Sequence, residues 1–139
     1  MKKAYEWIEH TADVGVRVFG DDLKSLFSHA ANAFFEIITE TDTIEPRKTY
    51  TITAKGDGWE ELLVNWLNEL LFLFDTKGLV FKEFEIEEIR RDYLRAKAKG
   101  ELFDLKKHPL KTGIKAVTYH QLKVEKAKDH WEAQVIFDI

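Results

Sequence analysis

The sequence predicts an α+β domain with antiparallel or mixed β-sheets and two main amphipathic helices. Two long segments space their apolar side chains three and four residues apart, as helices do, and several shorter segments alternate apolar and polar residues, as strands do. Many strand-like segments follow the second helical segment. This order favours sheets from which the helices are segregated, and therefore an α+β fold.

The first predicted helix begins at Leu23 and ends near Ile38. Its apolar side chains form one stripe along the helix, which is the pattern of a surface helix that buries one face. Asp21 or Asp22 comes just before this segment, and either carboxylate can accept hydrogen bonds from the first turn.

The second predicted helix runs from Gly58 to about Lys77. Asp57 followed by Glu60 fits a capping box at its start, and Gly78 supplies a left-handed residue that stops it. Apolar side chains cover more than half of its circumference. We therefore expect this helix to lie at the centre of the core.

Strand-like alternation occurs in residues 14–19, 50–54, 94–99 and 131–139. The last of these segments has the clearest pattern, and the alternation continues to Ile139. Lys128 and Asp129 form a tight-turn signal before it. We therefore expect a hairpin that pairs this strand with residues 121–126.

Composition limits the class of protein. A chain of 139 residues with 45% hydrophobic residues is long enough for one core, so we expect a single domain over residues 1–139. No cysteine is present, which excludes disulfides and thiolate chemistry. No segment has the apolar run of a signal peptide or a membrane span, so we expect a cytoplasmic protein without a membrane partner. The net charge of −4 disfavours a general nucleic-acid coat protein.

The usual catalytic signatures are missing from the sequence. The five histidines do not have the spacing of metal ligands, and both serines lie inside the first predicted helix. Glycine-rich loops that bind phosphates are absent as well. We therefore assign no catalytic residue.

Residues 104–113 form the longest irregular segment, and such a loop often carries function. Basic side chains gather in and just after it: Lys106, Lys107, His108, Lys111 and Lys115. They can form an ordinary solvated surface, or they can dock an anionic partner such as RNA, a nucleotide or an acidic protein surface. Lys115 lies in a strand-like segment and is therefore better positioned to act than a lysine on a loop.

Carboxylates near the two chain ends suggest a second site. Asp13 or Thr11 can satisfy backbone donors in a local turn. At the other end, Asp138 lies beside the main-chain carboxylate of Ile139. If the two ends meet, three carboxylates converge, and a hard cation such as Ca²⁺ or Mg²⁺ would relieve their repulsion. Nothing in the local sequence establishes that the ends meet.

Four segments together resemble the archease family: residues 10–18, 61–75, 113–122 and 131–139. The resemblance implies a small accessory protein of the RtcB-type tRNA-splicing RNA ligase. Archeases promote guanylylation of this ligase, allow repeated turnover and broaden its use of nucleoside triphosphates, and they are not known as independent enzymes. Some have been proposed as chaperone-like modulators of tRNA methyltransferases, which gives an alternative partner.

The resemblance also implies site residues. The metal ligands of the family correspond to Asp13, Asp138 and the terminal carboxylate of Ile139, with Ca²⁺ as the expected ion. In the mechanism that we consider, Lys115 and His108 face the ligase or a nucleotide, where fixed positive charge assists a polyphosphate. Whether RNA is contacted directly is left open.

Two other functions compete with this interpretation. A metal-dependent phosphoester hydrolase could use Asp13, Asp138 and a histidine such as His10 or His120, and it would turn over substrate alone. A general chaperone or binding module would protect unrelated proteins and would have no specific effect on the ligase.

Overall fold

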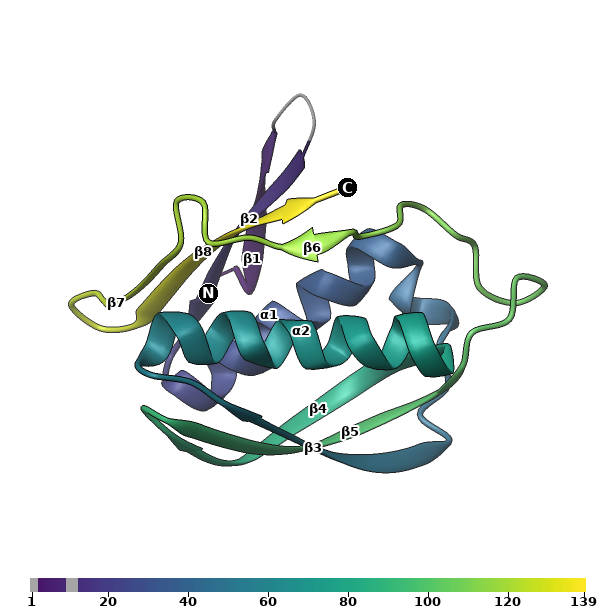
Figure 1. Ribbon diagram of the computed structural model, residues 1–139, viewed down its shortest axis with the longest axis horizontal. Helices are drawn as coiled ribbons and strands as arrows, with labels where there is room; N and C mark the ends of the chain where they lie inside the picture. The colour runs from purple at the N-terminus through teal and green to yellow at the C-terminus, as the bar shows by residue number, and fades with distance from the viewer. Residues whose placement is uncertain (1–2, 10–12) are drawn as a thin grey trace.

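The computed structural model describes residues 3–9 and 13–139, in which two β-sheets enclose two helices (Figure 1). In chain order the elements are β1 Tyr5–Glu9, β2 Asp13–Gly20, α1 Leu23–Ile38, the 3-10 helix η1 Thr41–Thr43, β3 Lys48–Lys55, α2 Trp59–Lys77, β4 Leu79–Arg90, β5 Tyr93–Leu102, β6 Ala116–Val117, β7 Lys123–Lys126 and β8 Trp131–Asp138. The predicted α+β class is confirmed.

One sheet has the order β1-β2-β8-β6, and β7 also pairs with β8. The other sheet has the order β3-β5-β4, and every described strand pairing is antiparallel. The segment β8, which comes last in the chain, lies in the interior of its sheet beside β2, which comes near the beginning (Figure 1). This arrangement places residues from both ends of the chain side by side.

The helix boundaries follow the predicted signals, with one difference. Asp22 caps α1, where its carboxylate accepts a hydrogen bond from the Ser25 N–H at 2.8 Å. Gly78 ends α2 with a φ of +66°, a conformation that favours glycine. The predicted capping box at the start of α2 is wrong, because Gly58 is the N-cap. The Glu61 carboxylate instead accepts from the Asp57 N–H at 3.0 Å.

The core lies between the two sheets and is rich in aromatic rings. Trp66 of α2 is fully buried, and its indole N–H donates to the carbonyl of Phe27 in α1 at 3.0 Å. Because the buried indole N–H keeps a hydrogen-bond partner, burial of the Trp66 ring stabilises the contact between the helices. Phe35 of α1 packs edge-on against Phe81 of β4, with ring centroids 5.7 Å apart. Together these contacts tie both helices to the smaller sheet.

The hairpin predicted at the end of the chain is confirmed, because Lys126 of β7 pairs with Trp131 of β8. The main-chain N–H of Ala127 donates to the His130 carbonyl at 2.8 Å and closes the turn. Within the described residues, no helix is long and apolar enough to cross a membrane.

Candidate functional site

The carboxylates predicted from the two chain ends lie on adjacent strands. Asp13 of β2 is the direct cross-strand partner of Asp138 of β8. On the other side of β8, Ala116 of β6 is also the partner of Asp138. The three residues therefore form one row across the sheet. Asp13 and Asp138, which we call the carboxylate pair, therefore lie side by side, which is the condition that the charge argument left open.

The carboxylate pair lies on the side of the sheet that faces away from the core. The next row consists of Val14, Phe137 and Val117, and Phe137 and Val117 are buried in the core. Because successive residues of a strand point to opposite faces, Asp13 and Asp138 belong to the outer face. Asp138 is exposed and accessible to an ion or a partner.

Carboxylates directly opposite each other on a sheet repel, and elsewhere this sheet compensates for that repulsion. Glu125 of β7 stands opposite Glu132 of β8. A basic side chain accompanies each of them: Lys123 Nζ lies 3.4 Å from Glu125, and His130 Nε2 lies 3.3 Å from Glu132. Within the described part of the chain, no Lys, Arg or His forms an ion pair with Asp138. The oxygen donors of the carboxylate pair suit a hard divalent cation.

Two further predicted residues flank the carboxylate pair. Ile139 is half-buried and packs against the core. The main-chain N–H of Lys115 donates to the carbonyl of Asp138 at 2.7 Å, so Lys115 lies beside the end of β8. Its side chain is exposed and forms no ion pair with any residue of the described segments 3–9 and 13–139. The main chain of Lys115 is thus held next to the main chain of Asp138.

Part of the predicted site lies outside the described residues. His10 and Thr11 lie outside the described residues, and His120 is exposed on the loop between β6 and β7. Among residues 3–9 and 13–139, no three His, Asp or Glu side chains are arranged to hold a metal ion. The predicted ligand set differs from such a group because its third member is a main-chain carboxylate.

The basic segment is engaged largely in internal contacts. The Lys111 ammonium donates to the carbonyl of Glu36 at 2.7 Å, and the Lys111 N–H donates to the carbonyl of Ile38 at 2.8 Å. A cation at the C-terminal end of α1 is favourable because the helix carbonyls point towards it. Lys107 lies 2.8 Å from both Glu45 and Glu101. The predicted basic docking surface is therefore much smaller than its sequence suggests.

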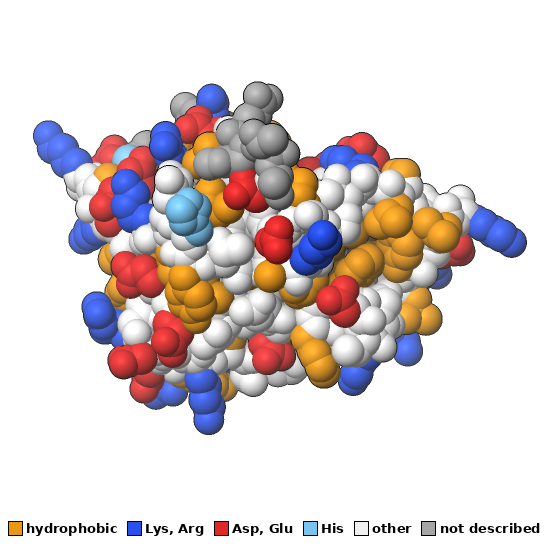
Figure 2. Space-filling view, turned by 45° about the horizontal axis from the view of Figure 1, so that its top comes forward, with side chains coloured by type: hydrophobic (Ala, Val, Ile, Leu, Met, Phe, Trp, Pro, Cys, Tyr) orange, Lys and Arg blue, Asp and Glu red, His pale blue; other side chains and the backbone are white. Residues whose placement is uncertain are grey.

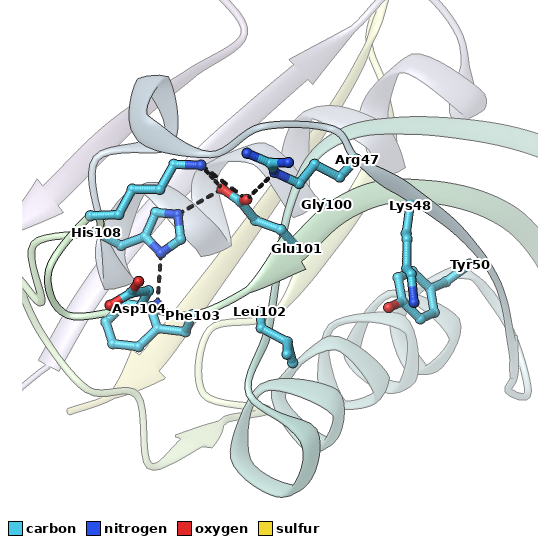
Figure 3. A pocket seen from close by; sticks show the side chains of 10 residues that line it. Arg47, Lys48, Tyr50, Gly100, Glu101, Leu102, Phe103, Asp104 and His108 are labelled. Carbon is cyan, nitrogen blue, oxygen red and sulfur yellow. Dashed lines mark hydrogen bonds and ion pairs between the residues drawn. The ribbon is translucent and has the colours of Figure 1, made fainter.

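His108 does not face a partner, in contrast to the expectation from sequence. Its side chain is fully buried and stacks on Phe103, with ring centroids 5.6 Å apart (Figure 3). Nδ1 accepts from the Asp104 N–H at 2.9 Å, so the proton of the neutral ring is on Nε2, which donates to Glu101 at 2.9 Å. This imidazole fixes the loop.

Glu101 is the centre of this network, and the sequence did not identify it. Burial raises the pKa of Glu101, but hydrogen bonds from the Glu45 N–H, Lys107 and His108 outweigh that effect and lower the pKa to about 2. Arg47 adds a contact at 3.0 Å. Glu101, Arg47, Lys107 and His108 are among the residues that line a cleft of about 680 Å³ (Figure 3). The sequence offered one signal for Glu101: it follows Gly100 in β5, and the other charged residues of this strand are basic.

Comparisons with known proteins agree with one another. The sequence model of the Archease protein family matches residues 5–139. Curated archeases from Methanosarcina acetivorans and Pyrococcus abyssi are each 43% identical over 141 residues, which covers 99% of this chain and 97% and 99% of the relatives.

Solved structures give the same result. The solution structure of protein 1598 from Methanobacterium thermoautotrophicum has a TM-score of 0.75 at 32% identity, and the match covers 98% of this chain and 99% of that one. The crystal structure of an archease from Thermotoga maritima, described as a possible chaperone, has a TM-score of 0.67 at 24% identity, with 100% and 98% covered. The second match bears on the fold alone. On these sequence and structural matches, the chain belongs to the archease family.

Proposed function

We propose that this protein is a non-catalytic accessory protein of an RtcB-type tRNA-splicing RNA ligase. In this role it promotes guanylylation of the ligase, supports repeated turnover and broadens the range of nucleoside triphosphates used. Membership of the archease family supports the proposal. The observation on which it chiefly depends is the cross-strand pairing of Asp13 with Asp138, because this pairing brings two carboxylates, the oxygen donors that hard cations prefer, into one row of the outer face.

In the proposed site, Asp13, Asp138 and the terminal carboxylate of Ile139 bind a divalent cation, with Ca²⁺ as the expected ion. Oxygen donors of this kind are typical Ca²⁺ ligands, and a bound ion would offset their mutual repulsion. The ion would supply a fixed positive charge at the surface that meets the ligase. The pairing register of β2 and β8 sets the spacing between Asp13 and Asp138.

Lys115 is the proposed contact to the ligase or its nucleotide. It is exposed, and its main chain is fixed to Asp138. Lys115 directly precedes β6, and a lysine whose main chain is held in this way can place its ammonium group beside polyphosphate charge. His108 has a different role in this proposal, because it holds the loop that leads to Lys115.

A ligase assay tests the proposal. Guanylylation and repeated RNA joining are measured without this protein, with the wild type and with Asp138→Ala. We expect the wild type to stimulate both and the variant to lose most of the stimulation while its circular dichroism spectrum stays unchanged, because Asp138 lies on the outer face. Equal stimulation by Asp138→Ala would contradict the metal-dependent mechanism.

Glu125→Gln is the matched control, since Glu125 belongs to the other cross-strand acidic pair of the same sheet. It should stimulate like the wild type. The protein without ligase is also incubated with GTP and with RNA. Release of phosphate or cleavage of RNA there would favour the phosphoester hydrolase.

A chaperone-like function is the second candidate, and one observation favours it. Leu102, Leu105 and Leu110 are 66%, 70% and 55% exposed around the irregular segment after β5. Exposed apolar side chains of this size are typical of surfaces that bind other proteins. The client could be another RNA-processing enzyme such as a tRNA methyltransferase. Protection of that client from aggregation, lost in Leu105→Ser but not in Asp138→Ala, would identify this function.

A further inference from the structure

The edge of the five-stranded sheet is interrupted between β6 and β7. Val117 pairs with Phe137, and Lys123 pairs with Gln134, so five residues, 118–122, stand opposite only two, 135–136. The extra residues leave the plane of the strand and form a turn. We call residues 118–122 the edge turn.

Hydrogen bonds fix the edge turn on β8. Both the N–H and the hydroxyl of Thr118 donate to the carbonyl of Ile136, at 3.1 and 2.8 Å. The His120 N–H donates to the Thr118 hydroxyl at 3.2 Å, and the Gln134 amide donates to the Gln121 carbonyl at 3.1 Å. Gln121 adopts a φ of +52°, which is uncommon for a residue other than glycine. The surrounding contacts must therefore stabilise this shape.

This fixed turn presents two aromatic rings. Tyr119 is 60% exposed, more than any other aromatic side chain in the described chain, and His120 is exposed beside it. Neither ring contacts another ring, and neither side chain forms a hydrogen bond or ion pair within the described residues. An interrupted edge strand protects a sheet from pairing with other chains, but any polar turn would achieve that. Edge protection therefore leaves the two rings unexplained.

The edge turn lies close to the carboxylate pair. Ala116 is the cross-strand partner of Asp138, and Tyr119 follows it by three residues, a reach of at most about 11 Å. Lys115 lies on the other side of Ala116 and donates its N–H to Asp138. Figure 2 shows the face that carries the C-terminal strand end, where acidic, basic and histidine side chains are interspersed. Two aromatic rings, a lysine and the carboxylate pair thus follow one edge within a few residues.

This combination has the chemistry of a nucleotide site. Aromatic side chains stack on nucleobases, while lysine and a divalent cation bind phosphates. Building on the proposed function, we propose that the edge turn is a stacking platform for the base of a nucleoside triphosphate. Its phosphates extend along β6 towards Lys115 and the carboxylate pair. Tyr119 supplies the principal stacking surface, and His120 supplies a second ring at the edge of the base.

Titration of GTP with Mg²⁺ into the whole chain tests this proposal without the ligase. The signals of the Tyr119 and His120 rings are followed by NMR spectroscopy. We expect both to shift in a saturable way, and we expect Tyr119→Ala to weaken GTP binding about tenfold, as loss of one stacked base contact does. Tyr119→Phe keeps the ring and should bind like the wild type. Phe72→Ala, which removes another exposed ring on α2, is the matched control.

The ligase assay gives a second readout. With Tyr119→Ala, the KM of GTP for guanylylation should rise about tenfold while the rate at saturating GTP is retained. Ring signals that do not respond to millimolar GTP would overturn the stacking proposal. It would also be overturned if Tyr119→Ala changed the KM of RNA and left the KM of GTP unchanged. If the wild type binds GTP but does not stimulate the ligase, the proposed function fails and the stacking proposal stands.

Discussion

The position of a single carboxylate determines what it can do in this protein. Asp138 and Glu132 lie on the same strand, and each stands opposite another acid. Glu132 has His130 as a neighbour, while Asp138 lies next to Asp13 at the end of the sheet. Like charges in such positions destabilise a sheet by about 0.2–1 kcal/mol. The divalent cation that we propose at this pair would offset a destabilisation of this size.

Glu101 determines part of the acid sensitivity of the fold. Its folded pKa, about 2, lies below the ordinary value of 4.5, so its contribution to stability is fully present above about pH 4.5 and is lost as the pH falls through about 2. We expect Glu101→Gln to cost about 1–3 kcal/mol at pH 7, because it weakens hydrogen bonds to charged groups. The difference between wild type and variant should shrink between pH 4.5 and 2 in urea unfolding experiments. A difference that stays constant over this range would refute the assignment.

The roles of some residues could be predicted from the sequence. The role of His108 could not, because it depends on how the loop that carries it folds. Asp13 and Asp138 were identified as a carboxylate constellation from charge and from the family resemblance. His108 was assigned to the surface because its neighbours in sequence are lysines. Its burial depends on Glu101 and on the Asp104 N–H, and that geometry exists only after the loop has closed.

At the scale of elements, regular alternation made prediction reliable. The segment β8 was identified because its buried residues keep one parity over most of its length. The longest strand, β4, was missed, since its pairing with β5 shifts register between Phe81 and Glu83 and again between Ile86 and Glu88. Each shift inserts a residue and reverses the alternation, so that no single parity describes the strand.

The first of these shifts lies where β4 passes very close to β5. A Cβ atom on Gly100 would lie 1.9 Å from the Val80 carbonyl oxygen and 2.8 Å from the Phe81 Cα atom. Both are backbone atoms of the paired strand, which cannot move without breaking the ladder. We therefore expect Gly100→Ala to lower the free energy of unfolding by about 2–3 kcal/mol, measured by thermal and chemical denaturation.

Gly113→Ala is the matched control for this prediction, because nothing lies within 4 Å of a Cβ atom at that position. It should change stability by less than about 0.5 kcal/mol. If Gly100→Ala were as stable as Gly113→Ala, close packing of β4 on β5 would not be the reason for glycine at position 100.

At the scale of the whole molecule, topology creates the candidate site. The segments β2 and β8 lie more than a hundred residues apart in sequence, yet they are neighbours in one sheet, so their ends bring Asp13 and Asp138 together. Local patterns gave the α+β class and both helices. They could not give the strand order, because pairing of distant strands depends on packing of the complete core. The charge argument raised this juxtaposition as a possibility, and the family resemblance selected it before the structure did.

The central claim is that the carboxylate pair and the end of the chain bind a divalent cation. Calorimetric titration with Ca²⁺ of the wild type, Asp138→Asn, a chain extended beyond Ile139 and the control Glu125→Gln tests it most directly. We predict one saturable site in the wild type and the control, and much weaker binding in the other two, with all four folded by circular dichroism. Absence of Ca²⁺ binding by the wild type at millimolar concentration, or unchanged binding by Asp138→Asn, would contradict the claim.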